Sequence, residues 1–362
     1  MLQARMSQDL PVTSSHLFPT ASDTLHDVAA FILGPLTINY IHPISAKSRG
    51  EAAGSASQRL GSSLPCTRTR MFPHWEEIIP SVTSILHWAF QQTKPNVVAD
   101  RWPALLPIVL GLIDDPEPSF RIGGLRTLHV FLCKCPQRIL TATGIGRVYE
   151  DAVYPSLLFF PGSVKEHESA NLLSEAYRVL LQLADAGQGV DQKRRSLDRI
   201  VRDGILTGYR HAPDSSVVVE ILMRTLAATV SELGIHAVKH LQNVLCVIES
   251  VIMNTPAFLH PPVAEAAVDV INTVLVCCWP RFVEAGYEGQ VIRIVIVCWL
   301  ALGDQAELDS SATKHQYLGL QERLITTMSL MKKIVRSHSP ERRDQITSDM
   351  ISREPRLASV FR

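Results

Sequence analysis

A chain of 362 residues is long enough for about two ordinary domains or for one elongated array of repeats. Its 35 Lys and Arg residues balance 35 Asp and Glu residues. This neutrality argues against a general binder of nucleic acids or anionic membranes, because such proteins usually carry a basic excess. Hydrophobic residues make up 46% of the chain, which is enough for a large core.

The first part of the chain, residues 1–72, differs in composition from the rest. Residues 45–69 are rich in Ser and Gly and contain few large apolar side chains, so burial there cannot offset the entropy cost of ordering. Only residues 23–36 show the apolar spacing of a short helix. We therefore expect a poorly ordered N-terminal segment with one short helix and a low-complexity linker.

Residues 73–337 carry apolar side chains at helical spacing almost throughout, and no dipeptide typical of a β-hairpin turn lies between alternating runs. The pattern predicts an all-α fold of about eleven helices. They are expected over residues 75–92, 102–113, 118–133, 138–160, 169–184, 196–209, 213–233, 235–254, 263–279, 290–302 and 316–337, with the 138–160 segment divided into two short helices. The charged tail, residues 338–362, is expected to fray.

One helical hairpin shows the clearest pattern. Its first helix places six apolar side chains on one face, and a turn containing Asp114 and Asp115 follows, with Arg121 opening the second helix. The six are Trp102, Leu105, Leu106, Val109, Leu110 and Ile113. This hairpin resembles the HEAT repeat, in which the acidic turn and the basic residue form a ladder between neighbouring repeats. At ~40–47 residues a unit, residues 73–337 fit roughly six repeats of a HEAT/armadillo-like α-solenoid. The alternative is a single hairpin in another kind of helical bundle.

The cysteines and the apolar runs indicate the compartment. The chain has seven cysteines, an odd number, and no C-x-x-C pair, so neither a zinc site nor a disulfide framework is indicated. Six of them lie in apolar helical runs, which predicts buried free thiols in a reducing environment. The most apolar run, 291–302, is interrupted by Arg293 and is shorter than the ~20 residues of a membrane span. We expect a soluble protein of the cytoplasm or nucleus.

Catalytic motifs are not found: the sequence contains no P-loop, no nucleophile elbow and no H-E-x-x-H. Gly144-Ile145-Gly146 is half of a dinucleotide fingerprint, but no strand precedes it, so a helix break is favoured. Asp114 and Asp115 could act as an acid and base pair, although solvated acids at a helix junction are commoner. The sequence therefore predicts no enzyme and no cofactor.

Two further patterns have both a functional and a structural interpretation. His236 and His240 are spaced to share a metal ion, but a packed or solvent-facing helix pair is favoured. The basic run 193–195 is either a solvated helix start, which is favoured, or a nuclear signal.

Large aromatic side chains are the remaining candidates for binding. An array of helical hairpins offers an extended surface to partners, and interfaces favour large aromatic residues. Trp88, Phe90, Phe282 and Trp299 are candidate partner contacts, although core packing is favoured for each.

A longer succession of motifs surrounds the hairpin. The first motif, within residues 105–132, consists of Leu-Leu-Pro, the two Asp residues and R-x-x-G. The second is Thr143-Gly144-Ile145-Gly146, which leads to Tyr149-Glu150-Asp151. The third is Leu-Phe-Phe-Pro-Gly at 158–162, and the fourth runs from Glu168-Ser169 through Leu172-Leu173 to Tyr177. This succession resembles the Tel-two-interacting protein two family, the smallest subunit of the triple-T (TTT) complex.

The resemblance implies a non-enzymatic scaffold without catalytic residues to carry over. It also implies two larger helical-repeat partners and an indirect association with the heat-shock-protein-ninety chaperone system. Together these proteins support folding, assembly and stability of phosphatidylinositol-3-kinase-related kinases, and so DNA-damage signalling. The alternative is another HEAT-repeat adaptor, such as a transport receptor or a phosphatase scaffold.

Overall fold

The structure is a computed structural model that describes residues 75–186, 189–253, 260–308, 314–336, 348 and 350–361. In these residues the chain is helical, without a strand, and the only β-type pairing is an isolated bridge between Pro161 and Val164. The predicted all-α class is therefore confirmed for the described residues. The predicted short helix and linker within residues 1–72 lie outside them.

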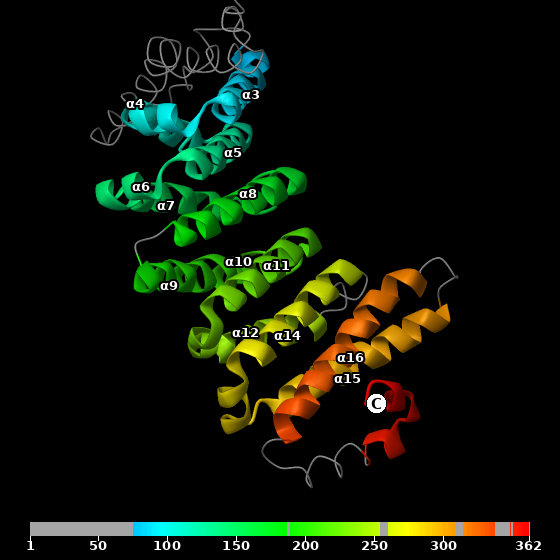
Figure 1. The fold of residues 1–362 in the computed structure, drawn as a ribbon. Helices are drawn as coiled ribbons and strands as arrows, with labels where there is room; N and C mark the ends of the chain where they lie inside the picture. Colours follow the sequence, from blue (N-terminus) through cyan, green and yellow to red (C-terminus); the bar gives the residue numbers. More distant parts are fainter. Residues whose placement is uncertain are drawn as a thin grey trace, which may run out of the picture. The chain divides into compact units, whose positions relative to one another are not determined.

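The chain divides into two compact units. Of the described residues, unit 1 contains 75–112 and 126–136, and unit 2 contains 113–125 and 137–361. Unit 1 holds α3 (Trp75–Gln92), nearly all of α4 (Pro95–Ile113) and the second half of α5 (Pro118–Lys134) (Figure 1).

Two contacts hold α3 to α5 within unit 1. The rings of Phe90 and Phe131 meet edge to face with centroids 6.1 Å apart, and both side chains are buried. Lys134 Nζ donates to the main-chain carbonyls of Gln91 and Thr93, each at 2.6 Å. These carbonyls lie at the C-terminal end of α3, where no main-chain donor of the helix remains to satisfy them.

Helix α4 begins earlier than the apolar spacing predicts, at Pro95, because proline is well suited to the first position of a helix. Leu105, Val109 and Ile113 are buried as predicted, whereas the predicted inward residues Trp102, Leu106 and Leu110 are only half-buried. Ile108 is buried as well, so the buried stripe is rotated toward that side.

Unit 2 contains the remaining elements. They are α6 (Gln137–Thr143), α7 (Ile145–Val153), η4 (Tyr154–Leu158), α8 (Glu166–Asp185), α9 (Gly189–Arg199), η5 (Ile200–Leu206), α10 (Thr207–His211), α11 (Ser216–Leu233), η6 (Gly234–His240), α12 (Leu241–Met253), α14 (Pro261–Glu284), α15 (Glu288–Leu308), α16 (Lys314–Arg336) and η7 (Pro355–Ser359). Most predicted helices are thus present, with boundaries shifted by a few residues.

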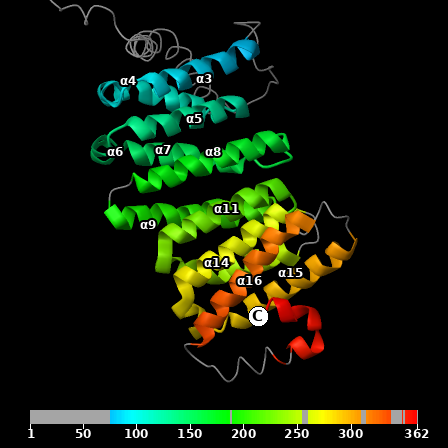
Figure 2. The same cartoon turned by 45° about the vertical axis from the view of Figure 1, so that its right-hand side comes forward.

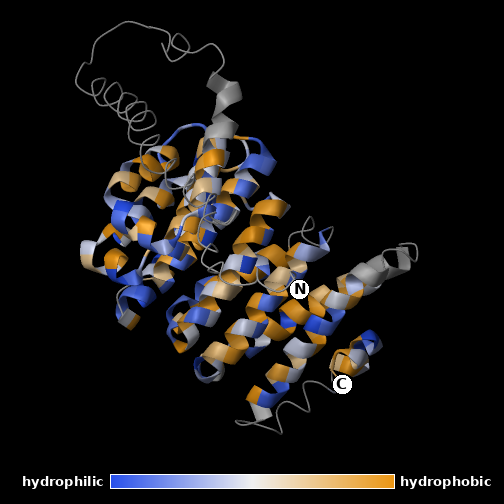
Figure 3. Ribbon diagram, turned by 45° about the horizontal axis from the view of Figure 1, so that its top comes forward, coloured by the Kyte–Doolittle hydropathy of each residue, from blue (hydrophilic) through white to orange (hydrophobic). Residues whose placement is uncertain are grey.

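These helices form two rows in unit 2. In the first row α8 packs on α11, α11 on α14, and α14 on α16 (Figure 2). In the second row η5 contacts α12, and α12 contacts α15. Each of α9, α12 and α15 also contacts a helix of the first row. Apolar and polar residues alternate along the helices (Figure 3). The buried side chains, such as Leu222, Val270 and Leu324, come from the apolar faces.

Local sequence explains the breaks between these helices. Gly144 has φ of 70° and separates α6 from α7, which confirms the predicted helix break, because glycine adopts this left-handed conformation without strain. Pro155 occupies the start of η4. Ser215 caps α11 by accepting a bond from the Val218 N–H, as predicted from the capping sequence.

Two features of unit 2 differ from the sequence prediction. The helix expected over residues 196–209 is continuous, but its middle part, η5, is a π-helix. The tail was expected to fray, yet Leu357, Val360 and Phe361 are buried and η7 packs on α15. The tail prediction was therefore wrong for residues 350–361, because three apolar side chains anchor an otherwise charged segment.

Two described helices are long and apolar enough to cross a membrane when judged by length and composition alone, namely Pro95–Ile113 and the Pro261–Phe282 part of α14. The run that the sequence marks as most apolar, 291–302, belongs to neither of them. The criterion is weak, because core helices of soluble proteins also meet it. Of the α14 stretch 56% is buried, and of the α4 stretch 28%.

Candidate interaction surface

The turn after α4 is organised by Arg121. The Arg121 side chain is 8% exposed, and its Nε donates to the main-chain carbonyl of Asp115, with Nη2 reaching the carbonyl of Asp114 at 3.4 Å. Asp115 Oδ1 accepts a bond from the Glu117 N–H at 2.9 Å, which shapes the turn. Burial lowers the pKa of Arg121, and the two aspartates act in the opposite direction. The three predicted residues therefore meet, but the hydrogen bonds of Arg121 go to carbonyl oxygens of the turn.

Arg121 also joins the turn to η4 and to the loop after it. Its Nη1 lies 3.3 Å from Ser156 Oγ, and its guanidinium lies over the Phe159 ring at 4.6 Å from the centroid. The Phe159 carbonyl accepts a bond from Ser169 Oγ of α8 at 2.6 Å, and Ser169 is fully buried. Motif residues far apart in the sequence, from the hairpin, the Phe-Phe turn and the Glu-Ser pair, thus meet in one cluster of unit 2.

The Tyr149-Glu150-Asp151 motif faces α9. Arg199 Nη1 bonds to Asp151 at 2.7 Å and approaches Glu150 at 3.4 Å, while Ser196 Oγ donates to Glu150 at 3.1 Å. The Arg199 guanidinium lies 3.8 Å from the centroid of the Tyr154 ring. Burial raises the pKa of Tyr154 above its ordinary value, so its phenol stays neutral. This contact binds α9 to α7 and η4.

Similar bonds recur along unit 2 over a range of sequence distances, among them 39 residues for Lys193 with Glu232 and 55 for Thr327 with Asn272. The bond from Arg199 to Asp151 spans 48 residues, that from His240 to Asp198 spans 42, and that from Gln290 to Glu249 spans 41. Lys239 and Arg293 add ion pairs to Asp198 and Glu249. Tyr209 with Ser250 spans 41 residues, and Ser215 with Glu166 spans 49. These bonds therefore join helices of unit 2 that are well separated in the sequence.

The predicted aromatic contacts have different fates. Phe90 and Phe282 are buried at 1% and 0% exposure, so they are core residues, as the favoured interpretation predicted, and not exposed partner contacts. Trp88 is half-buried. Trp299 is half-buried too, and its Nε1 donates to the Arg356 carbonyl of the C-terminal segment at 3.1 Å. Sequence periodicity cannot separate a core aromatic from a surface one when apolar residues surround both.

Sequence reasoning missed the more exposed apolar residues. Val276 and Trp279, one turn apart on α14, are 61% and 46% exposed, and Leu158 in η4 is 64% exposed. A signal was available for Leu158, which begins the Leu-Phe-Phe-Pro-Gly motif.

The other candidate residues take structural roles. His240 bonds to Asp198, while His236 is exposed, and within the described residues no group of three potential metal ligands comes together. Lys193 of the basic run pairs with Asp185 and Glu232 at 2.7 and 2.6 Å, which favours a helix start fixed by ion pairs.

The six described cysteines are free thiols. Burial raises the pKa of Cys135 and Cys278 to about 11 and that of Cys298 to about 12. The prediction of buried thiols was wrong for Cys133 and Cys246, which are exposed. Cys66 lies outside the described residues.

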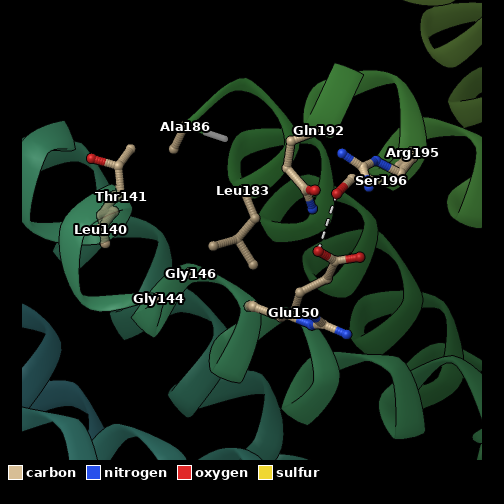
Figure 4. A pocket seen from close by; sticks show the side chains of 11 residues that line it. Leu140, Thr141, Gly144, Gly146, Glu150, Leu183, Ala186, Gln192, Arg195 and Ser196 are labelled. Atoms are coloured by element: carbon tan, nitrogen blue, oxygen red, sulfur yellow. Dashed lines mark hydrogen bonds between the residues drawn. The ribbon is translucent and has the colours of Figure 1, made fainter. Parts of the chain in front are cut away.

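A cavity of about 290 Å³ opens between the α6–α7 junction, the C-terminal end of α8 and the first turns of α9 (Figure 4). Leu183 projects into its middle, and Ser196 and Glu150 are hydrogen-bonded on one wall. Its lining residues are Leu140, Thr141, Gly144, Gly146, Arg147, Glu150, Leu183, Ala186, Gln192, Arg195 and Ser196. The cavity thus combines an apolar floor with a polar rim.

A comparison with protein families identifies the family to which these features belong. A family model described as the Tti2 family matches residues 3–260, which is most of the chain and includes both the hairpin and the motif cluster around Arg121. The chain belongs to the Tti2 family. The Tti2 family is a family of non-catalytic complex subunits, and membership implies a component of the TTT complex. The match includes residues 3–72, although the composition of that segment differs from the rest.

Proposed function

We propose that this Tti2-family chain is a non-enzymatic scaffold subunit of a TTT-type complex, and that its helical hairpins stack as a HEAT-like α-solenoid. Family membership over residues 3–260 carries the proposal. Hydrogen bonds between elements 39–55 residues apart support the solenoid part, because stacked HEAT units of ~40–47 residues bring neighbouring hairpins into contact.

The roles of the candidate residues are in keeping with a scaffold. Asp114, Asp115 and Arg121 are engaged in fixing a turn, and Glu150 and Asp151 are engaged in joining α7 to α9. These groups hold helices in register, and a binding surface depends on that register more than on the reactivity of any one side chain.

The proposed partners are the two larger helical-repeat subunits of the complex. Through them the chain acts indirectly with the heat-shock-protein-ninety system on phosphatidylinositol-3-kinase-related kinases, supporting their folding, assembly and stability. We place this activity in the cytoplasm, the nucleus or both. Nucleic acid and membrane lipid are not proposed as partners, in keeping with the zero net charge.

Affinity capture of the full chain from native extract, followed by mass spectrometry, tests the proposal. We expect two much larger helical-repeat proteins in near-equal amounts with the bait. Depletion of the chain should lower the steady-state levels of several of these kinases without changing their messenger RNA. Recovery of a Ran-type GTPase or a phosphatase catalytic subunit as the sole stable partner would instead indicate a transport receptor or a phosphatase scaffold.

A further inference from the structure

The cavity shown in Figure 4 is lined at its bottom by apolar side chains and has room for one side chain or a few. Leu140 and Leu183, from α6 and α8, are 5% and 7% exposed, and Ala186 closes the end of α8. Gly146 has open space beside it, because a Cβ there would approach only the Leu140 carbonyl, at 3.9 Å. A leucine-sized side chain from outside would therefore find apolar contacts at the bottom of this cavity.

Two arginines of the cavity lining differ from their basic neighbours. On α9 and η5, Lys193, Arg194, Arg199 and Arg202 each pair with a carboxylate. Arg195 bonds only to a main-chain carbonyl, through Nε at 3.3 Å from the oxygen of residue 191.

Arg147 is the second of these arginines, and its guanidinium has no hydrogen bond or ion pair within the described residues. Both residues are exposed, so two positive charges at the cavity are without a carboxylate partner in the described part of the chain. An incoming carboxylate can pair with them without displacing an existing ion pair.

We propose that this cavity docks an acidic segment of a protein partner, which inserts one apolar side chain between Leu140 and Leu183 and pairs its carboxylates with Arg147 and Arg195. The inference rests on the proposed scaffold function, because the docked segment belongs to a protein that the scaffold holds. It adds the chemistry of that segment: acidic residues flanking a leucine or a phenylalanine.

A protein segment fits these observations better than a nucleic acid does. Arg147 and Arg195 can pair with isolated carboxylates, but two arginines are too few to hold a continuous row of phosphates. The apolar floor has no role in binding a phosphate backbone, whereas an apolar anchor with a charged rim is typical of peptide recognition.

Fluorescence anisotropy with the full-length protein tests the proposal. The probe is a fluorescein-labelled peptide with three glutamates on each side of one central leucine, and two further peptides replace the leucine by serine or the glutamates by lysines. We expect the first peptide to bind roughly tenfold more tightly than the other two, and its affinity to fall when salt is added. Equal binding of the serine peptide, or tighter binding of a labelled single-stranded oligonucleotide, would overturn the proposal.

Two variants separate the charged rim from the apolar floor. Arg147→Glu combined with Arg195→Glu should lower the affinity for the leucine peptide by roughly tenfold or more. Gly146→Phe fills the cavity without changing any charge, and should abolish the leucine preference while circular dichroism shows the fold intact. The matched control is Arg210→Glu combined with Arg353→Glu, two exposed arginines with the same total change of charge, and it should leave the affinity unchanged.

The same protein preparation distinguishes this inference from the proposed function. Co-purification of the wild-type chain with larger helical-repeat subunits, together with no binding of the leucine peptide, would refute the docking site and leave the scaffold role standing. Peptide binding without co-purification would refute the scaffold role instead. If the control substitutions at Arg210 and Arg353 lowered the affinity for the peptide as much as those at Arg147 and Arg195, the binding would be nonspecific electrostatic attraction, and the docking site would be refuted.

Discussion

Replacing Arg121 by methionine should destabilise unit 2 markedly. Methionine keeps an apolar stem of similar length but removes the guanidinium that reaches two turn carbonyls and Ser156 Oγ. A hydrogen bond from a charged donor contributes about 1.5–3 kcal/mol. The bonds to Ser156 and to the Asp114 carbonyl, at 3.3 and 3.4 Å, are long and should contribute little to the free energy of unfolding. The bond to the Asp115 carbonyl is assigned the full contribution.

The remaining contributions act in opposite directions. Loss of the contact with the Phe159 ring should lower the free energy of unfolding by about 1 kcal/mol. Removal of a buried cation, which is costly to desolvate, should raise it by a similar amount. The net expectation for Arg121→Met is a loss of about 2–3 kcal/mol, or roughly 5–10 °C in the midpoint of thermal unfolding. Arg121→Lys should lose about half as much, because an ammonium group cannot bond to the carbonyls in the forked geometry of a guanidinium.

Urea unfolding followed by circular dichroism at 222 nm measures this loss, with Arg138→Met as the control, since Arg138 is exposed. Asp114→Asn keeps the main-chain carbonyl that accepts from Arg121 and should therefore cost less than Arg121→Met. If Asp114→Asn proved as damaging as Arg121→Met, the carboxylate rather than the carbonyl would be the partner, and the interpretation of the turn would be refuted.

Three further outcomes follow from burial. Leu105→Ala should cost about 3 kcal/mol in urea unfolding and Leu106→Ala about 1, because Leu105 is 1% exposed and Leu106 is half-buried; equal losses would contradict the assigned face of α4. Gly204→Ala should cost about 1–2 kcal/mol by the same assay, since its Cβ would lie 3.2 Å from a tyrosine ring, and a stabilised variant would show that the π-helix relaxes freely. Burial raises the pKa of the Cys298 thiol from 9.0 to about 12, so at pH 8.5 its thiolate fraction is about a thousandfold lower than that of an ordinary thiol. Peptide mapping after iodoacetamide treatment should find Cys246 labelled and Cys298 unlabelled until urea is added, and early labelling of Cys298 would contradict its burial.

Helical periodicity was sufficient to predict where most helices lie. The span of α3 agrees with the prediction at both ends, because a continuous apolar stripe and the polar residues after Gln92 mark it clearly. Periodicity did not show which side of a helix is more deeply buried. Phe282 and Trp279 lie one turn apart on α14, yet one is fully buried and the other is 46% exposed, since tertiary neighbours decide the difference.

The motif residues were predicted to matter, but their contacts were not foreseen. The acidic turn and Arg121 were recognised from spacing, whereas the choice of main-chain carbonyls over carboxylates depends on the three-dimensional path of the turn. The partnership of Arg199 with Tyr154 and Asp151 brings together residues more than 40 positions apart, which no local pattern encodes. The burial of Phe361 in a charged tail was missed for the same reason.

The bonds between helices of unit 2 also bear on how this part of the protein would deform. We expect a small rotation where two helices meet to leave bonds such as Asp151 with Arg199 or Glu249 with Gln290 intact, because each joins only two neighbouring elements. In the stacked array proposed above, such rotations would add up along the rows. Unit 2 would then bend around a bulky partner without the unfolding of any helix.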